Sequence, residues 1–177
     1  MRILYLARKG WHNTPHLRML NDYSSGNSSI PAYGPAILRL ALGAIFIAHG
    51  GQKLFGWWGG GGLDETAAGF AQLGLQPAYP LAVLVGTVEF GGGILLLLGA
   101  LTLFASIALA IEMAVAIWKV HAAHGFFVSA NGSEYNFALI CALICLMLTG
   151  AGAFSIDQWR AASAAADRAG RARARKV

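Results

Sequence analysis

The segment Tyr79–Ala122, YPLAVLVGTVEFGGGILLLLGALTLFASIALAIEMAVAIWKVHAA, decides the fold. It is about twice as long as the roughly 20 apolar residues that one bilayer-spanning helix needs. Its only formal charges are those of Glu89, Glu112 and Lys119, and the only good break in it is Gly99-Ala100-Leu101-Thr102. The pattern predicts two antiparallel transmembrane helices that are joined by a very tight turn.

Each of these predicted helices carries one glutamate near its middle. An ionisable side chain at the centre of a bilayer costs about 2.5–3.5 kcal/mol on insertion scales, so such a residue is a hypothesis for a functional site. Gly86, Glu89 and Gly93 follow the spacing of one helix face, and because small residues allow helices to pack closely in lipid, we expect Glu89 to face another helix. The second helix is expected to point a face of small and charged residues inward, made of Ala105, Ala108, Glu112, Ala116 and Lys119.

The composition of the whole chain agrees with a membrane protein. Of its 177 residues, 56% are hydrophobic and 12% are charged, whereas charged residues make up about 25% of a soluble domain. The net charge of +5 is concentrated at the two ends, since four of the 13 Lys and Arg residues precede the first apolar segment and six follow the last one. Basic flanks of this kind favour contact with anionic lipid on the cytoplasmic side over binding of nucleic acid.

The predicted fold class is all-α, an integral membrane four-helix bundle with short loops and basic cytoplasmic tails. Four spans are expected at residues 35–55, 79–99, 101–122 and 135–152, with a short helix on the membrane surface at 64–73. These spans make residues 35–157 the membrane domain. Residues 1–34 form a basic, flexible tail in which Met19 is a second candidate start of the chain. Residues 158–177 form a basic Ala/Arg tail that is either amphipathic or disordered.

The number of spans determines the expected topology. An even number places both basic tails on the same side of the membrane, and the positive-inside rule makes that side cytoplasmic. We therefore expect a multi-pass protein of the inner (cell) membrane with the lipid bilayer as its surroundings. Arg39 lies early in the first span, and its long side chain is expected to snorkel to the cytoplasmic surface.

Polar residues gather toward the non-cytoplasmic ends of the predicted spans. At about 1.5 Å per residue, Glu89 and Glu112 lie about 15 Å from those ends and His49 about 9 Å. The candidates for one pocket inside the bundle are His49, Lys53, Glu89, Glu112, Lys119, His121 and Glu134. Two carboxyl groups at similar depth require a nearby cation if one is to stay ionised. The set could exchange protons, bind a polar head group, or only hold the helices together.

Neither the histidines nor the cysteines form a recognisable site. His121 and His124 have a spacing that two metal ligands can use, but no third ligand follows at a fixed spacing, so no metal is predicted. Cys141 and Cys145 are four residues apart, which on a helix separates their Cβ atoms by about 5–6 Å. A disulfide requires about 3.8 Å, so we interpret both as packing thiols. No cofactor-binding motif is visible.

Four motifs, taken in order, resemble the DoxX family of small four-span membrane proteins. They are LRLALGAIFIAHGGQKLFG (38–56), GTVEFGGGILLLLG (86–99), NGSEYNFALI (131–140) and LTGAGAFSID (148–157). The residues at family positions are Arg39, His49, Gly50, Lys53, Glu89, Gly92, Gly93, His121 and Glu134. The resemblance implies a four-helix membrane bundle, and some members of the family are linked to sulfur oxidation with quinone as acceptor or to oxidoreductase assemblies that act against oxidative stress.

Three functions remain open at this point. The first is a subunit of a membrane redox system whose pocket binds a quinone-like molecule and which requires a redox partner protein, because no electron-donor site is visible. The second is a non-enzymatic scaffold that recruits partners. The third, a proton or small-solute pathway, is disfavoured because the cytoplasmic half lacks polar residues apart from Arg39. A homo-oligomer is compatible with each of them.

Overall fold

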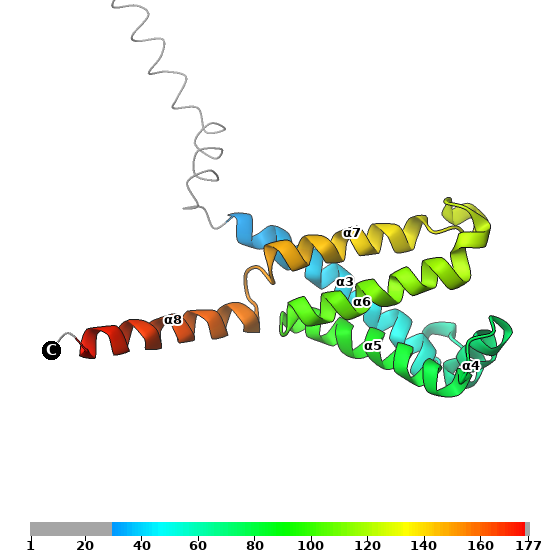
Figure 1. The fold of residues 1–177 in the computed structure, drawn as a ribbon, viewed down its shortest axis with the longest axis horizontal. Helices are drawn as coiled ribbons and strands as arrows, with labels where there is room; N and C mark the ends of the chain where they lie inside the picture. Colours follow the sequence, from blue (N-terminus) through cyan, green and yellow to red (C-terminus); the bar gives the residue numbers. More distant parts are fainter. Residues whose placement is uncertain (1–29, 176–177) are drawn as a thin grey trace, which may run out of the picture.

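The computed structural model describes residues 30–175, and every regular element in that range is a helix. The prediction of an all-α fold is therefore confirmed. The long helices α3 (Ile30–Phe55), α5 (Ala78–Leu98), α6 (Thr102–Ala116) and α7 (Glu134–Thr149) lie side by side, and α8 (Ile156–Ala174) extends away from them (Figure 1). The tail predicted at residues 1–34 lies largely outside the described residues, although α3 begins before residue 35.

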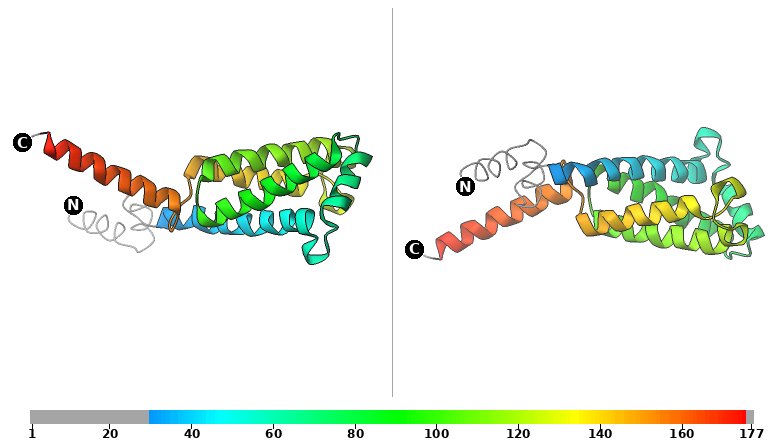
Figure 2. Two further views of the ribbon diagram at one scale, coloured as in Figure 1. Left: turned by 90° about the horizontal axis from the view of Figure 1, so that it is seen from below. Right: turned by 90° about the horizontal axis from the view of Figure 1, so that it is seen from above.

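Short elements connect the long helices. The segment between α3 and α5 contains η1 (Trp57–Gly59) and α4 (Gly62–Gln72), and the segment between α6 and α7 contains η2 (Ile117–His121), η3 (Ala122–His124) and η4 (Val128–Ala130). Both segments lie at one end of the molecule, which we call the loop end. The α5–α6 turn, the start of α3 and the start of α8 lie at the opposite end, which we call the turn end (Figure 2).

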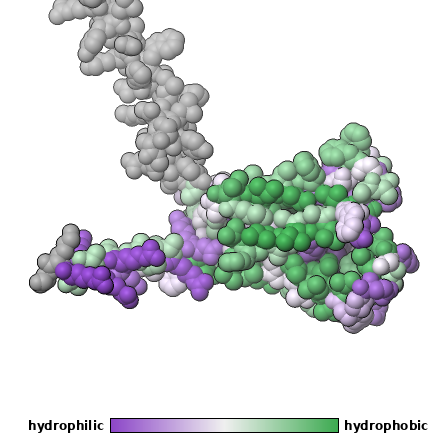
Figure 3. Space-filling view, in the orientation of Figure 1, coloured by the Kyte–Doolittle hydropathy of each residue, from purple (hydrophilic) through white to green (hydrophobic). Residues whose placement is uncertain are grey.

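Three helices in the described range are long and apolar enough to cross a membrane, at Ala32–Phe55, Ala78–Leu98 and Thr102–His124. They correspond to the first three predicted spans. The fourth corresponds to α7, an apolar helix of 16 residues, which is about 24 Å long and shorter than the roughly 30 Å hydrocarbon core. Figure 3 shows apolar surface over these helices and hydrophilic residues on α8 and around α4. Four spans remain a prediction.

Glycines bring α3 and α5 into close contact. A Cβ atom added at Gly93 would lie 2.7 Å from the backbone nitrogen of Ile47, and one added at Gly43 would lie 2.9 Å from the carbonyl oxygen of Gly93. A Cβ atom at Gly50 would collide with the backbone of Phe90. The prediction that small residues let helices approach around Glu89 is confirmed, since Glu89 is 3% exposed between Gly86 and Gly93.

The predicted tight turn between α5 and α6 is also confirmed. Gly99 and Leu101 both adopt left-handed conformations, with φ of 61° and 50°. The carboxylate of Asp157 accepts hydrogen bonds from the N–H groups of Leu101 and Thr102, each at 2.9 Å, and the Asp157 N–H donates to the Gly99 carbonyl at 2.9 Å. A residue at the start of α8 therefore satisfies the first N–H groups of α6.

Arg39 does not snorkel to the surface as predicted; it is 2% exposed. Its guanidinium donates hydrogen bonds to five carbonyl oxygens, those of Leu96, Leu97, Ala151, Ala153 and Phe154. The prediction was wrong because the last carbonyls of a helix have no partner within that helix. The end of α5 and the α7–α8 connection bring several such groups together, and an arginine carries five N–H donors. We call Arg39, Asp157 and their backbone partners the turn-end clasp.

The C-terminal tail is helical over residues 156–174 and does not pack on the bundle. The Ser155 side chain accepts a hydrogen bond from the Gln158 N–H and begins α8 as its N-cap. Every residue from Gln158 to Arg175 is exposed. The many alanines of α8 favour a helix without tertiary support.

Candidate ligand pocket

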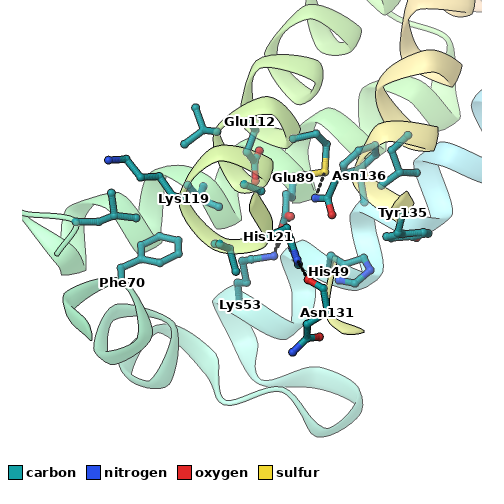
Figure 4. Close-up of a pocket in the computed structure, with 18 of the residues that line it drawn as sticks. His49, Lys53, Phe70, Glu89, Glu112, Lys119, His121, Asn131, Tyr135 and Asn136 are labelled. Atoms are coloured by element: carbon teal, nitrogen blue, oxygen red, sulfur yellow. Dashed lines mark hydrogen bonds and ion pairs between the residues drawn. The ribbon is translucent and has the colours of Figure 1, made fainter. Parts of the chain in front are cut away.

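A cavity of about 430 Å³ lies at the loop end, between α3, α5, α6 and α7 (Figure 4). This volume is within the range of about 300–1,000 Å³ that is typical of ligand sites. Six of the seven predicted pocket residues line it, namely His49, Lys53, Glu89, Glu112, Lys119 and His121. Most of the remaining wall is apolar and includes Phe46, Phe70, Leu75, Leu81, Val85, Val115, Val120 and Leu139.

Lys53 and Glu89 form an ion pair across the α3–α5 interface. The Lys53 ammonium lies 2.8 Å from Oε1 and 2.6 Å from Oε2 of Glu89. The absence of a side chain at Gly86 lets α3 approach closely beside this pair, since a Cβ atom there would lie 2.7 Å from Cδ2 of Leu54. Lys53 therefore points inward and does not snorkel to the interface, which was the alternative left open by its position in the sequence.

Glu112 reaches the cavity from α6 and lies close to the Glu89 side chain. Its Oε2 atom is buried and forms no hydrogen bond with any described residue. Lys119, two turns further along, is exposed and places its ammonium 3.8 Å from the ring centroid of Trp118. The pocket thus combines one internally neutral ion pair with one buried carboxyl oxygen whose hydrogen-bonding capacity is unused.

The predicted inward face of α6 is only partly correct. The buried residues of α6 are Thr102, Ala105, Ser106, Leu109 and Met113, whereas Ala108 and Lys119 are exposed. The face is rotated because α6 packs against both α5 and α7, and the larger side chains Leu109 and Met113 fill the space between them. Glu112 lies at the border of this face and is half-buried.

The histidines and the glutamate of the second loop mainly hold the loop together. His121 Nδ1 lies 2.6 Å from the Asn131 carbonyl oxygen, and His124 Nδ1 lies 3.0 Å from that of Val120. The Glu134 carboxylate accepts a hydrogen bond from the Val128 N–H at 2.9 Å and does not line the cavity. In residues 30–175, no three His, Cys, Asp or Glu side chains come together in a way that could hold a metal ion.

The structure adds Tyr135 and Asn136 of α7 to the pocket, and sequence reasoning missed both. Asn136 is 8% exposed and donates a hydrogen bond to the sulfur of Met113 at 3.4 Å, which is a weak acceptor. The Tyr135 ring lies 6.4 Å from that of His49, centroid to centroid. An asparagine at the start of an otherwise apolar segment was the available signal, because a buried amide in lipid requires a partner.

The fold and this cavity together define a class, a helical membrane protein with a polar pocket enclosed by apolar walls. The chain belongs to the DoxX family, since the family model described as DoxX matches residues 34–122. That range contains α4, α5, α6 and all but the first four residues of α3, together with all six of the predicted residues that line the cavity, but not Tyr135 or Asn136.

Similarity to individual proteins supports the same family. An "Uncharacterized protein" of Haemophilus influenzae is 35% identical over 71% of this chain and 89% of its own length. An "Uncharacterized membrane protein" of Mycobacterium tuberculosis is 31% identical over 68% of this chain and 77% of its own length. The "Putative oxidoreductase CatD" of Bacillus subtilis is 29% identical over 70% of this chain and 84% of its own length. No solved structure matches.

Proposed function

We propose that this DoxX-family protein is a subunit of a membrane redox system and that its pocket binds a quinone-like lipophilic molecule. The observation that carries the proposal is the cavity itself, in which an unpaired buried carboxyl oxygen of Glu112 faces an otherwise apolar space. The Bacillus subtilis relative is named an oxidoreductase, and that name agrees with this class of function.

The residues present fit a quinone head group. A quinone presents carbonyl acceptors and a quinol presents hydroxyl donors, and a neutral carboxyl group can pair with either. Reduction of a quinone to a quinol takes up two electrons and two protons. Glu112 and His49 are the groups that could hold and exchange those protons, whereas Glu89 is engaged by Lys53.

The electrons require another protein. The described residues include no set of side chains that could hold a metal, and a four-helix subunit of this kind would receive electrons from a redox partner. In this proposal α7 is the fourth span, both chain ends face the cytoplasm in the inner membrane, and the loop end with its pocket faces the opposite side. The basic residues of α8 support that orientation.

A scaffold without redox activity is the alternative, and α8 favours it. A long helix whose residues beyond Asp157 are all exposed offers a surface to a partner. A proton or solute pathway is less well supported. The half of the bundle nearer the turn end does contain the buried hydroxyls of Thr102 and Ser106, which lack partners among the described residues. Leu109, with 0% exposure, separates them from Glu112.

The test is the quinone content of the protein purified from its own membranes in mild detergent. Wild type is compared with Glu112→Gln and with Glu65→Gln, a matched change on the exposed part of α4. We expect near-stoichiometric quinone in wild type and Glu65→Gln and a clear loss in Glu112→Gln, with thermal unfolding followed by circular dichroism to show that each protein is folded. Quinone no higher than in an unrelated membrane protein would refute the proposal and favour the scaffold.

A further inference from the structure

We infer that the ligand enters the pocket sideways from the bilayer, through an opening between α5 and α6, and that it is a prenyl-chain lipid whose head pairs with Glu112. The inference rests on the proposed function for the location of the site, and it adds the route and the chemical class of the occupant. Leu81 and Val85 of α5 and Val115 of α6 line the cavity, and we place the opening between them.

The arrangement of α5 and α6 creates this opening. The two helices are joined by a tight turn at the turn end and diverge toward the loop end (Figure 1). The cavity occupies the wider part, and side chains from both helices line it. Val115 lines the cavity and is nevertheless 44% exposed, so the cavity reaches the molecular surface at this position.

The depth of Val115 decides what can enter there. It lies two residues beyond the midpoint of the membrane-capable helix Thr102–His124, which is about 3 Å along the helix axis. The hydrocarbon core extends about 15 Å to either side of the bilayer centre. An opening at this depth faces acyl chains, so a water-soluble molecule has no access to it and a molecule dissolved in the bilayer does.

The polar groups restrict the head group of that molecule. Lys53 and Glu89 satisfy one another, and among the described residues that line the cavity the buried side-chain atom without a partner is Oε2 of Glu112. An uncharged hydroxyl or carbonyl can pair with this atom. A phospholipid is excluded, because its charged head would have to be brought to the bilayer centre at a large cost. An uncharged head on an apolar chain, as in a prenyl quinone or a prenyl alcohol, meets both conditions.

The cavity reaches the surface a second time between α3 and α7, at His49 and Tyr135. Both side chains are exposed and polar, and Figure 4 shows them on the side of the cavity opposite Phe70 and Lys119. His49 lies about 8 Å along the axis from the midpoint of the membrane-capable helix Ala32–Phe55, so this opening also lies within the hydrocarbon core. The two openings therefore differ in the side chains that line them, which are apolar at Val115 and polar at His49 and Tyr135.

The experiment narrows the apolar opening and measures binding in lipid nanodiscs. Val115→Trp is the test variant and Ile111→Trp is its control, because Ile111 is exposed on the same helix and does not line the cavity. Three probes are used: a prenyl-chain quinone, a quinone with the same ring and no chain, and a prenyl alcohol with the same chain. Thermal unfolding of each variant is recorded in parallel.

Val115→Trp is expected to raise the Kd of both prenyl probes at least about tenfold, because extra side-chain volume in a packed apolar site generally weakens the equilibrium constant by that factor. The chain-free quinone should keep its affinity in Val115→Trp, and every probe should keep it in Ile111→Trp. An equal loss for chain-bearing and chain-free quinones, or no loss at all, overturns the inference and leaves the proposed function standing. Binding of the prenyl alcohol but not of either quinone overturns the redox function and retains the opening. No binding of any probe to wild type overturns both.

Discussion

Replacing Arg39 by methionine is expected to destabilise the protein strongly, because the guanidinium connects three parts of the chain at the turn end. It donates hydrogen bonds to the last carbonyls of α5 and to the α7–α8 connection. Methionine preserves most of the side-chain volume and donates no hydrogen bond. The five carbonyl oxygens then have no donor from residue 39.

The magnitude follows from the balance of two effects. A hydrogen bond with a charged partner contributes about 1.5–3 kcal/mol, so five of them give a gross loss on the order of 10 kcal/mol. Removing a buried guanidinium also removes a desolvation penalty of several kcal/mol, and water can reach part of the turn end. We therefore expect Arg39→Met to lower the free energy of unfolding by about 3–5 kcal/mol. Arg39→Lys should lie between Arg39→Met and wild type, because its ammonium has three donors.

The assay is reversible unfolding in mixed micelles, followed by circular dichroism as the fraction of denaturing detergent is raised. Arg168→Met on exposed α8 removes the same charge away from the turn-end clasp, and it should unfold like wild type. The reasoning is refuted if Arg39→Met and Arg168→Met unfold within about 0.5 kcal/mol of one another, the range usual for surface changes.

Three further predictions concern the α3–α5 interface, the capping of α6 by Asp157 and the ion pair. Gly50→Ala should destabilise the protein by about 1–3 kcal/mol or more because the added methyl group overlaps the α5 backbone. Gly91 has open space around it, so Gly91→Ala should be neutral or stabilise the protein by up to about 1 kcal/mol. The unfolding assay compares the two variants, and equal effects would contradict the packing argument. Asp157→Asn should cost about 1–2 kcal/mol at pH 7. Burial opposes the charged form of Asp157, but hydrogen bonds from backbone N–H groups and a nearby arginine outweigh it and hold the pKa of this carboxyl below its usual value. The charged form therefore stabilises the fold above pH about 4. The difference in unfolding free energy between wild type and Asp157→Asn should disappear as the pH falls below that value, and a constant difference would contradict the reasoning. Lys53→Met should destabilise the protein by about 3–5 kcal/mol because it leaves the buried Glu89 carboxylate unpaired. The double variant Lys53→Met with Glu89→Gln should recover most of the lost stability. A double variant as unstable as the single one would show that the pair does more than compensate charge.

The sequence was sufficient for features that depend on local patterns. Long apolar segments predicted the helices, and the break at Gly99 predicted the α5–α6 turn within one residue. The glycines on either side of Glu89 correctly predicted that this residue faces another helix. Each of these conclusions needs only the helix period and the cost of polar groups in lipid, which neighbouring residues in the chain determine.

The features that were missed depend on contacts between distant segments. Arg39 was expected at the surface because its position in the first span permits snorkelling, and only the structure shows five carbonyls within its reach. Glu134 was assigned to the pocket by its depth, but the loop that follows η3 folds back and uses its carboxylate. Asn136 was overlooked because its partner Met113 is 23 residues away and is not a typical hydrogen-bonding residue.

The two ends of the bundle are held by different kinds of interaction, and this difference locates the variable part of the molecule. At the turn end, Arg39 and Asp157 bind main-chain groups, which every sequence of this fold must satisfy. At the loop end, Lys53 and Glu89 bind each other, and Oε2 of Glu112 has no hydrogen-bond partner among the described residues. Glu89 also interacts electrostatically with Glu112, so the chemistry of the Glu112 carboxyl group depends on the ion pair and on what occupies the cavity. A change of ligand in a relative should therefore require substitutions at the loop end and leave the turn-end clasp intact.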